Sequence, residues 1–151
     1  MIRILIVDDH ASIRDSFRSA FEQYDDLKVV GSVADAAFAL FFCRDKQPDL
    51  VLMDICTAGG ASGLAATEKI KEAFPAIKVV VMTGFDEVTY MPRAKACGAD
   101  AFVEKGQNMT FFIQVIRDVM DGKSYFPEQK TIPVQPGEAP LTERELETLR
   151  L

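Results

Sequence analysis

The stretch Ile2-Arg-Ile-Leu-Ile-Val-Asp-Asp-His10 decides the fold of this chain. Four consecutive apolar residues, 4 to 7, precede two aspartates, without the alternation of polar and apolar side chains that a half-exposed strand shows. Strands that are buried on both faces have such continuous runs, and they occur in parallel sheets. The stretch therefore predicts the first strand of a parallel sheet with a layer of helices on each face.

Similar apolar runs recur along the chain at residues 50–53, 77–82 and 101–103. The run at residues 27–33 contains Lys28 and Gly31, which indicates a strand at an edge of the sheet. Between the strands, apolar residues at residues 13–24 and 111–120 recur at the spacing of one helix face.

Further helices are expected at residues 34–44 and 63–74, the second ended by Pro75. A shorter helix is expected before Gly98, with Pro92 in its first turn. The paired phenylalanines at residues 41–42 and 111–112 are expected in the core. Strand and helix alternate five times, which predicts an α/β fold.

Composition and punctuation divide the 151 residues into one domain and a tail. After residue 121 five prolines interrupt a polar stretch without periodicity, which predicts a domain at 1–121 and a linker at 122–140. Residues 141–151 are expected to open a new helix, with Thr142 and Glu145 spaced as a capping box. The chain ends just inside this helix, so we expect a second domain that is cut off.

Net charge and cysteine spacing exclude several classes of function for residues 1–121. The formal charge of −6 argues against a duplex-binding surface, which needs clustered Lys and Arg. Three cysteines without a C-x-x-C pair suggest neither a disulfide framework nor a zinc site. The first apolar run is too short for a membrane span, and we expect a cytoplasmic protein without membrane contact.

Polar residues follow the predicted strands at their carboxyl ends. Asp8 and Asp9 follow the first strand, Asp54 ends the run at 50–53, Thr83 follows 77–82 and Lys105 follows 101–103. In an open parallel sheet, ligands bind beyond these strand ends. Three carboxylates that meet there repel one another unless a cation lies among them, and carboxylate oxygens suit Mg²⁺. The sequence therefore predicts a magnesium-binding pocket.

Four motifs in order resemble the receiver domain of bacterial two-component response regulators. They are Ile4-Leu-Ile-Val-Asp-Asp-His10, Pro48-Asp-Leu-Val-Leu-Met-Asp54, Val79-Val-Val-Met-Thr83 and Gly98-Ala-Asp-Ala-Phe-Val-Glu-Lys105. Leu141-Thr-Glu-Arg-Glu-Leu-Glu-Thr-Leu149 resembles the opening of the LuxR-type helix-turn-helix domain of the NarL/FixJ subfamily. The resemblance implies a doubly wound, flavodoxin-like fold of five parallel strands in the order 2-1-3-4-5, with helices on both faces.

The resemblance also implies a chemistry for the pocket. Asp54 would accept a phosphoryl group from a sensor histidine kinase. Asp8, Asp9, Asp54 and the backbone carbonyl of Cys56 would hold Mg²⁺. The domain would be a phosphoacceptor switch rather than a classical enzyme.

The remaining residues of the pattern would sense the phosphoryl group. Lys105 would pair with its oxygens, Thr83 would donate a hydrogen bond to it, and Phe102 matches the aromatic residue that turns inward with Thr83. The phosphorylated protein would form a homodimer and regulate transcription through the missing DNA-binding domain.

The loop after Asp54 departs from the family pattern. The family usually has Met-Pro there and a glycine eight residues on, whereas this chain has Thr57-Ala58 and one added residue before Gly63. The loop is expected to be more flexible, which puts the position of the Cys56 carbonyl in doubt but not the acceptor.

Two further expectations concern hydrolysis and mobility. Cys56 and Phe85, two positions after Asp54 and Thr83, are poor partners for an attacking water, so the phosphorylated state should be long-lived. Residues 85–90 are expected to be mobile before phosphorylation. His10 invites a role as a metal ligand, but a residue that starts a helix faces solvent easily, and we favour this simpler interpretation.

Two other functions remain open at this point. An aspartyl-phosphate phosphatase shares the parallel sheet, but its nucleophile follows the first strand in an Asp-x-Asp pattern, which residues 8–10 do not provide. A pseudo-receiver that never takes phosphate and serves only as a dimerisation module fits the same fold.

Overall fold

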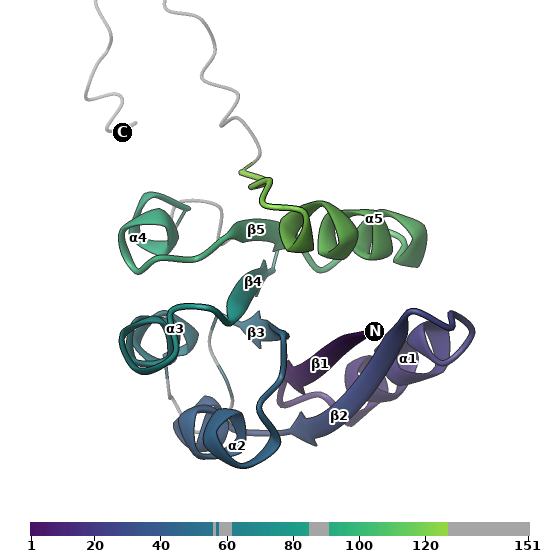
Figure 1. Ribbon diagram of the computed structural model, residues 1–151, viewed down its shortest axis with the longest axis horizontal. Helices are drawn as coiled ribbons and strands as arrows, with labels where there is room; N and C mark the ends of the chain where they lie inside the picture. The colour runs from purple at the N-terminus through teal and green to yellow at the C-terminus, as the bar shows by residue number, and fades with distance from the viewer. Residues whose placement is uncertain (56, 58–61, 85–90, 127–151) are drawn as a thin grey trace, which may run out of the picture.

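Five parallel strands form one sheet in the order β2-β1-β3-β4-β5 (Figure 1). The computed structural model describes residues 1–55, 57, 62–84 and 91–126. The strands are β1 (Ile2–Val7), β2 (Leu27–Val33), β3 (Leu50–Asp54), β4 (Lys78–Thr83) and β5 (Ala101–Glu104). The helices are α1 (Ala11–Phe21), α2 (Ala39–Lys46), α3 (Gly63–Ala73), α4 (Met91–Ala96) and α5 (Met109–Met120), with a 3₁₀ turn η1 (Ala36–Phe38) before α2. Fold class and strand order are those expected.

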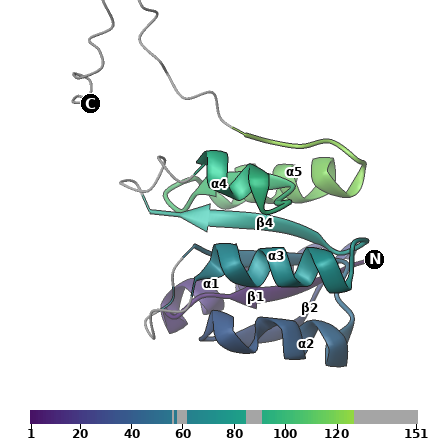
Figure 2. The same cartoon turned by 90° about the vertical axis from the view of Figure 1, so that its left-hand side faces the viewer.

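The helices lie in two layers, α1 and α5 on one face of the sheet and α2, α3 and α4 on the other (Figures 1 and 2). Successive residues of each strand therefore enter different cores. Ile4 and Ile6 pack with Phe17 and Phe112 under α1 and α5, whereas Leu5 packs under the other layer. Because every central strand contributes to both cores, continuous apolar runs are needed rather than alternating ones.

Most sequence-predicted bounds agree with the structure to within one or two residues. Residues 27–33 form the edge strand β2, as expected, and it is only partly buried. β4 is shifted by one residue, since Ile77 lies in a turn and Thr83 is the last strand residue. In the described part of α4, Pro92 lies in the first turn, as expected.

The single helix expected at residues 34–44 is wrong in detail. Asp35 accepts a hydrogen bond from the Ala37 amide and starts η1, and α2 follows and extends to Lys46. The prediction that both phenylalanines at 41–42 are in the core is also wrong for one of them. Phe41 is 60% exposed, because it projects from the outer side of α2, while the next residues turn toward the sheet.

The chain remains in contact with the sheet after α5. The Phe102 amide donates to the Tyr125 carbonyl at 2.9 Å, and the Tyr125 amide donates to Asp100 at 3.3 Å. This pairs Tyr125 with the outer edge of β5. Residues 123–126, hereafter the edge strap, thus occupy the start of the expected linker, and the expected helix at 141–151 lies outside the described residues.

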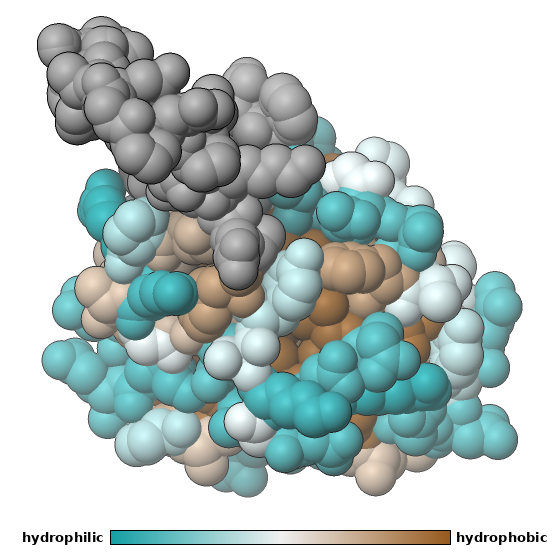
Figure 3. All heavy atoms as spheres, turned by 90° about the horizontal axis from the view of Figure 1, so that it is seen from above, coloured by the Kyte–Doolittle hydropathy of each residue, from teal (hydrophilic) through white to brown (hydrophobic). Residues whose placement is uncertain are grey.

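Hydrophobic residues are concentrated at the β5 end of the molecule. In a view from this side, a hydrophobic band lies between hydrophilic margins (Figure 3). Partly buried residues of α4, α5 and the edge strap pack against the two cores here, among them Met91, Met109, Phe111, Tyr125 and Phe126. No helix among the described residues is long and apolar enough to cross a bilayer.

Candidate functional site

The register of the central strands brings the acidic residues together. Val7 of β1 is paired with Met53 of β3, so the residues that follow, Asp8 and Asp54, are neighbours. The Asp8 amide continues the ladder with β2 by donating to the Val33 carbonyl at 3.0 Å. Asp8 and Asp54 are 0% and 2% exposed, so both carboxylates are removed from bulk water.

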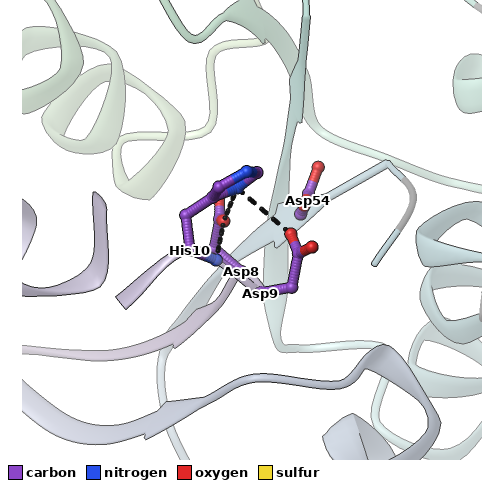
Figure 4. A group of neighbouring side chains, drawn as sticks. All are labelled: Asp8, Asp9, His10 and Asp54. Atoms are coloured by element: carbon purple, nitrogen blue, oxygen red, sulfur yellow. Dashed lines mark hydrogen bonds and ion pairs between the residues drawn. The ribbon is translucent and has the colours of Figure 1, made fainter. Parts of the chain in front are cut away.

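Asp8, Asp9, His10 and Asp54 each offer a ligand atom, and these atoms lie within 4.8 Å of one another (Figure 4). The first three come from the end of β1 and Asp54 from β3. This confirms that the strand ends converge.

Lys105 is the cation that contacts the two buried carboxylates. Its Nζ lies 2.9 Å from Asp8 Oδ2 and 3.1 Å from Asp54 Oδ1. Its backbone amide donates to the Thr83 carbonyl at 2.8 Å, which fixes the residue beyond the end of β5. In this state the lysine therefore bridges the carboxylates that it was expected to leave free for a phosphoryl group.

The electrostatics of the pocket favour a further cation. Burial, followed by repulsion from Asp8, raises the pKa of Asp54 to about 6, although Lys105 lowers it in part. Burial alone would lower the pKa of Lys105, but its hydrogen bond to Asp8 and the charges of both carboxylates outweigh this and raise it. One lysine does not neutralise three carboxylates.

The unsatisfied oxygen of Asp54 indicates the position of that cation. Asp54 Oδ2 is buried and has no hydrogen-bond partner among the described residues. A buried carboxylate oxygen without a partner is costly, and a divalent cation with oxygen ligands removes the cost. The residues present therefore fit Mg²⁺.

Thr83 and Phe102 lie on the neighbouring strands. Thr83 is fully buried at the end of β4, and its hydroxyl donates to the Gly84 carbonyl at 3.0 Å. Phe102 is 1% exposed and packs in the core under α2, α3 and α4, so its ring is already directed inward. Cys56 and Phe85 lie outside the described residues, as does the segment 85–90 for which mobility was predicted.

Sequence reasoning missed two residues that position Asp54. Thr57 was noted only as a departure from the family pattern, yet it is 2% exposed and its hydroxyl accepts a hydrogen bond from the Ala36 amide at 3.2 Å. Gly63 starts α3 so close to β3 that a Cβ there would overlap the Asp54 carbonyl oxygen. The glycine in the family pattern was the signal for the second contact.

Comparison with known proteins agrees with this geometry. The family model described as response regulator receiver domain matches residues 4–117. The chain belongs to the response regulator receiver family. This receiver domain is 34% identical over 130 residues to the oxygen regulatory protein NreC of Staphylococcus carnosus, covering 86% of this chain and 60% of the relative. NreC of Staphylococcus epidermidis is 33% identical over 124 residues, with 82% and 57% covered.

Solved structures show the same fold. A LuxR-family response regulator from Aurantimonas sp. SI85-9A1 superposes on this receiver domain with a TM-score of 0.77 at 29% identity, covering 84% of this chain and 91% of that one. The receiver domain of RcsB from Salmonella enterica, at 21% identity, gives 0.75 over 84% and 94%. The chain spans about three fifths of the length of the curated relatives it matches.

Proposed function

We propose that this receiver domain accepts a phosphoryl group on Asp54 from a sensor histidine kinase and thereby controls transcription through a C-terminal DNA-binding domain. The buried Asp54 Oδ2, which lacks a hydrogen-bond partner among the described residues, carries the proposal. It is a carboxylate oxygen at the end of a central strand, held beside a lysine and two further acids.

The proposed transfer forms a bond between an Asp54 oxygen and phosphorus while the bond from phosphorus to the kinase imidazole nitrogen breaks. The electron pair of the broken bond stays on that nitrogen. Asp8 and Asp9 would hold Mg²⁺ together with Asp54 and the Cys56 carbonyl, and the ion would neutralise charge on the transferring oxygens. No classical enzymatic turnover is needed, because the acceptor is consumed once.

Lys105 would change partners during this reaction. Its Nζ lies between Asp8 and Asp54, and esterification of Asp54 would remove the negative charge that it contacts. The ammonium group would then donate to the new phosphoryl oxygens, which carry more charge than the carboxylate did.

Thr83 and Phe102 would carry the signal toward α4 and the β5 end. The Thr83 hydroxyl now donates to a backbone carbonyl and would rotate to donate to a phosphoryl oxygen. Because Phe102 already fills its buried position, movement of Thr83 would tighten packing around an inward ring rather than draw in an exposed one. A phosphorylated homodimer would present the output domains to DNA.

Intact protein mass after incubation with a small phosphodonor tests phosphoryl acceptance. We expect one added phosphoryl group in the wild type with Mg²⁺ and none after chelation, because the crowded carboxylates then repel the donor. Asp54→Asn should stay unmodified while keeping its circular dichroism spectrum. A folded wild type that never gains mass would instead make the chain a pseudo-receiver.

The output function has its own test. A longer chain that continues beyond residue 151 should bind duplex DNA, and phosphorylation should strengthen this binding by promoting dimers on paired half-sites. Equal DNA affinity of the phosphorylated and unphosphorylated forms would contradict transcriptional control by this domain.

A further inference from the structure

His10 lies where the proposed magnesium pocket opens to solvent. Its side chain is 60% exposed, yet Nδ1 lies 3.1 Å from Asp8 Oδ1 and 3.2 Å from Asp9 Oδ1 (Figure 4). The ring is thus turned toward the carboxylates rather than away from them. The sequence alone did not indicate this, because a residue before a helix can point in either direction.

The distances around Nδ1 are those of ligands that share one ion. An octahedral ion with bonds of about 2.1 Å has adjacent ligand atoms about 3.0 Å apart and opposite ones about 4.2 Å apart. The two contacts of Nδ1 match adjacent positions, and all four ligand atoms of the group lie within 4.8 Å. With its proton on Nε2, the ring directs the Nδ1 lone pair to the space these oxygens face.

Lys105 and His10 contact different oxygens of the same carboxylates. The lysine takes Asp8 Oδ2 and Asp54 Oδ1, whereas the imidazole faces Asp8 Oδ1. The second oxygen of Asp54 is buried and has no hydrogen-bond partner among the described residues. The lysine therefore does not block the group of atoms that includes Nδ1.

We propose that His10 is a nitrogen ligand that gives this pocket a preference for first-row transition ions such as Mn²⁺ over Mg²⁺. The proposal rests on the function proposed above, because it needs the same pocket to hold a divalent cation. Imidazole suits transition ions, whereas Mg²⁺ favours oxygen and keeps its water. His10 would thus strengthen Mn²⁺ binding and leave Mg²⁺ binding nearly unchanged.

Electron paramagnetic resonance of Mn²⁺ tests the proposal without any phosphorylation. His10 is the only histidine in the sequence, so in a protein without a purification tag any imidazole coupling comes from this residue. We expect nitrogen modulation of the spin echo from bound Mn²⁺ in the wild type. It should disappear in His10→Phe, which keeps a ring but removes its nitrogen atoms.

Affinities separate this proposal from the one on which it depends. In His10→Phe, Mn²⁺ affinity should fall about tenfold and Mg²⁺ affinity, measured by competition, by less than about twofold. Ser12→Ala, an exposed change in the first turn of α1, should leave both affinities unchanged. Unchanged Mn²⁺ affinity in His10→Phe, or no nitrogen modulation in the wild type, would overturn the role of His10 alone. A wild type that binds neither ion would overturn the pocket as well.

Discussion

Asp54 combines burial with negative charge, and the combination has a measurable cost. Its pKa in the folded protein is raised to about 6 from an ordinary value of 3.8, by burial and by Asp8. The folded protein therefore binds this proton more tightly than the unfolded chain. The associated stability is present below the unfolded pKa and is lost as the pH rises through about 6.

Asp54→Asn should stabilise the protein in the absence of divalent cations. At about pH 8 we expect a gain of about 1–2 kcal/mol in the free energy of unfolding, less than the full pKa shift implies because the contact with Lys105 weakens. The gain should disappear toward about pH 4, where both forms are neutral. Urea unfolding in chelator at several pH values measures it, and a gain independent of pH would contradict the electrostatic cause.

Gly63 is required by proximity, since a Cβ would overlap the carbonyl oxygen of Asp54. Gly63→Ala should move the start of α3 away from β3 and lower the free energy of unfolding by about 2 kcal/mol. Gly106→Ala is the matched control, because a Cβ there meets nothing within 4 Å. If urea unfolding gives the two variants equal stability, the close approach is not a constraint.

At the scale of elements, the edge strap connects the end of α5 to β5 and α4. Tyr125 packs its ring edge-on against Phe111 with centroids 5.3 Å apart. Lys95 of α4 lies 4.9 Å above the ring of Phe126. Since the strap also accepts the amide of Phe102, movement of α4 or β5 would reach the following chain directly.

Replacing both aromatic residues of the edge strap should release it from the sheet. In the double variant Tyr125→Ala, Phe126→Ala, the Phe102 amide should exchange with solvent about tenfold faster, because its acceptor is held less firmly. The Val51 amide in central β3 serves as the internal reference. Equal protection of the Phe102 amide in both proteins would show that the strap is held by backbone pairing alone.

Strand positions were predictable because burial on both faces leaves a continuous apolar run, as at residues 4–7 and 50–53. The contacts that complete the site were not. The anchoring of Thr57 to η1 and the pairing of Tyr125 with β5 join residues far apart in sequence. Neither pairing produces a periodic pattern, so only the folded chain reveals it.

For the whole molecule, the lifetime of the phosphorylated state follows from residues outside the described ranges. Cys56 and Phe85 offer an attacking water no good hydrogen-bond partner, so the acyl phosphate should persist, as a transcriptional switch requires. Phe85→Glu should shorten its half-life several-fold, measured by loss of phosphoryl mass over time. If this variant decays no faster than the wild type, exclusion of water does not explain the lifetime.

The account as a whole depends on which residue takes the phosphoryl group. Phosphotransfer with Mg²⁺, followed by borohydride reduction and peptide sequencing by mass spectrometry, converts an aspartyl phosphate into homoserine at the modified position. We predict homoserine at position 54 alone, and none when Mg²⁺ is chelated. Homoserine at another aspartate, or undiminished phosphoryl incorporation in Asp54→Asn, would contradict the account.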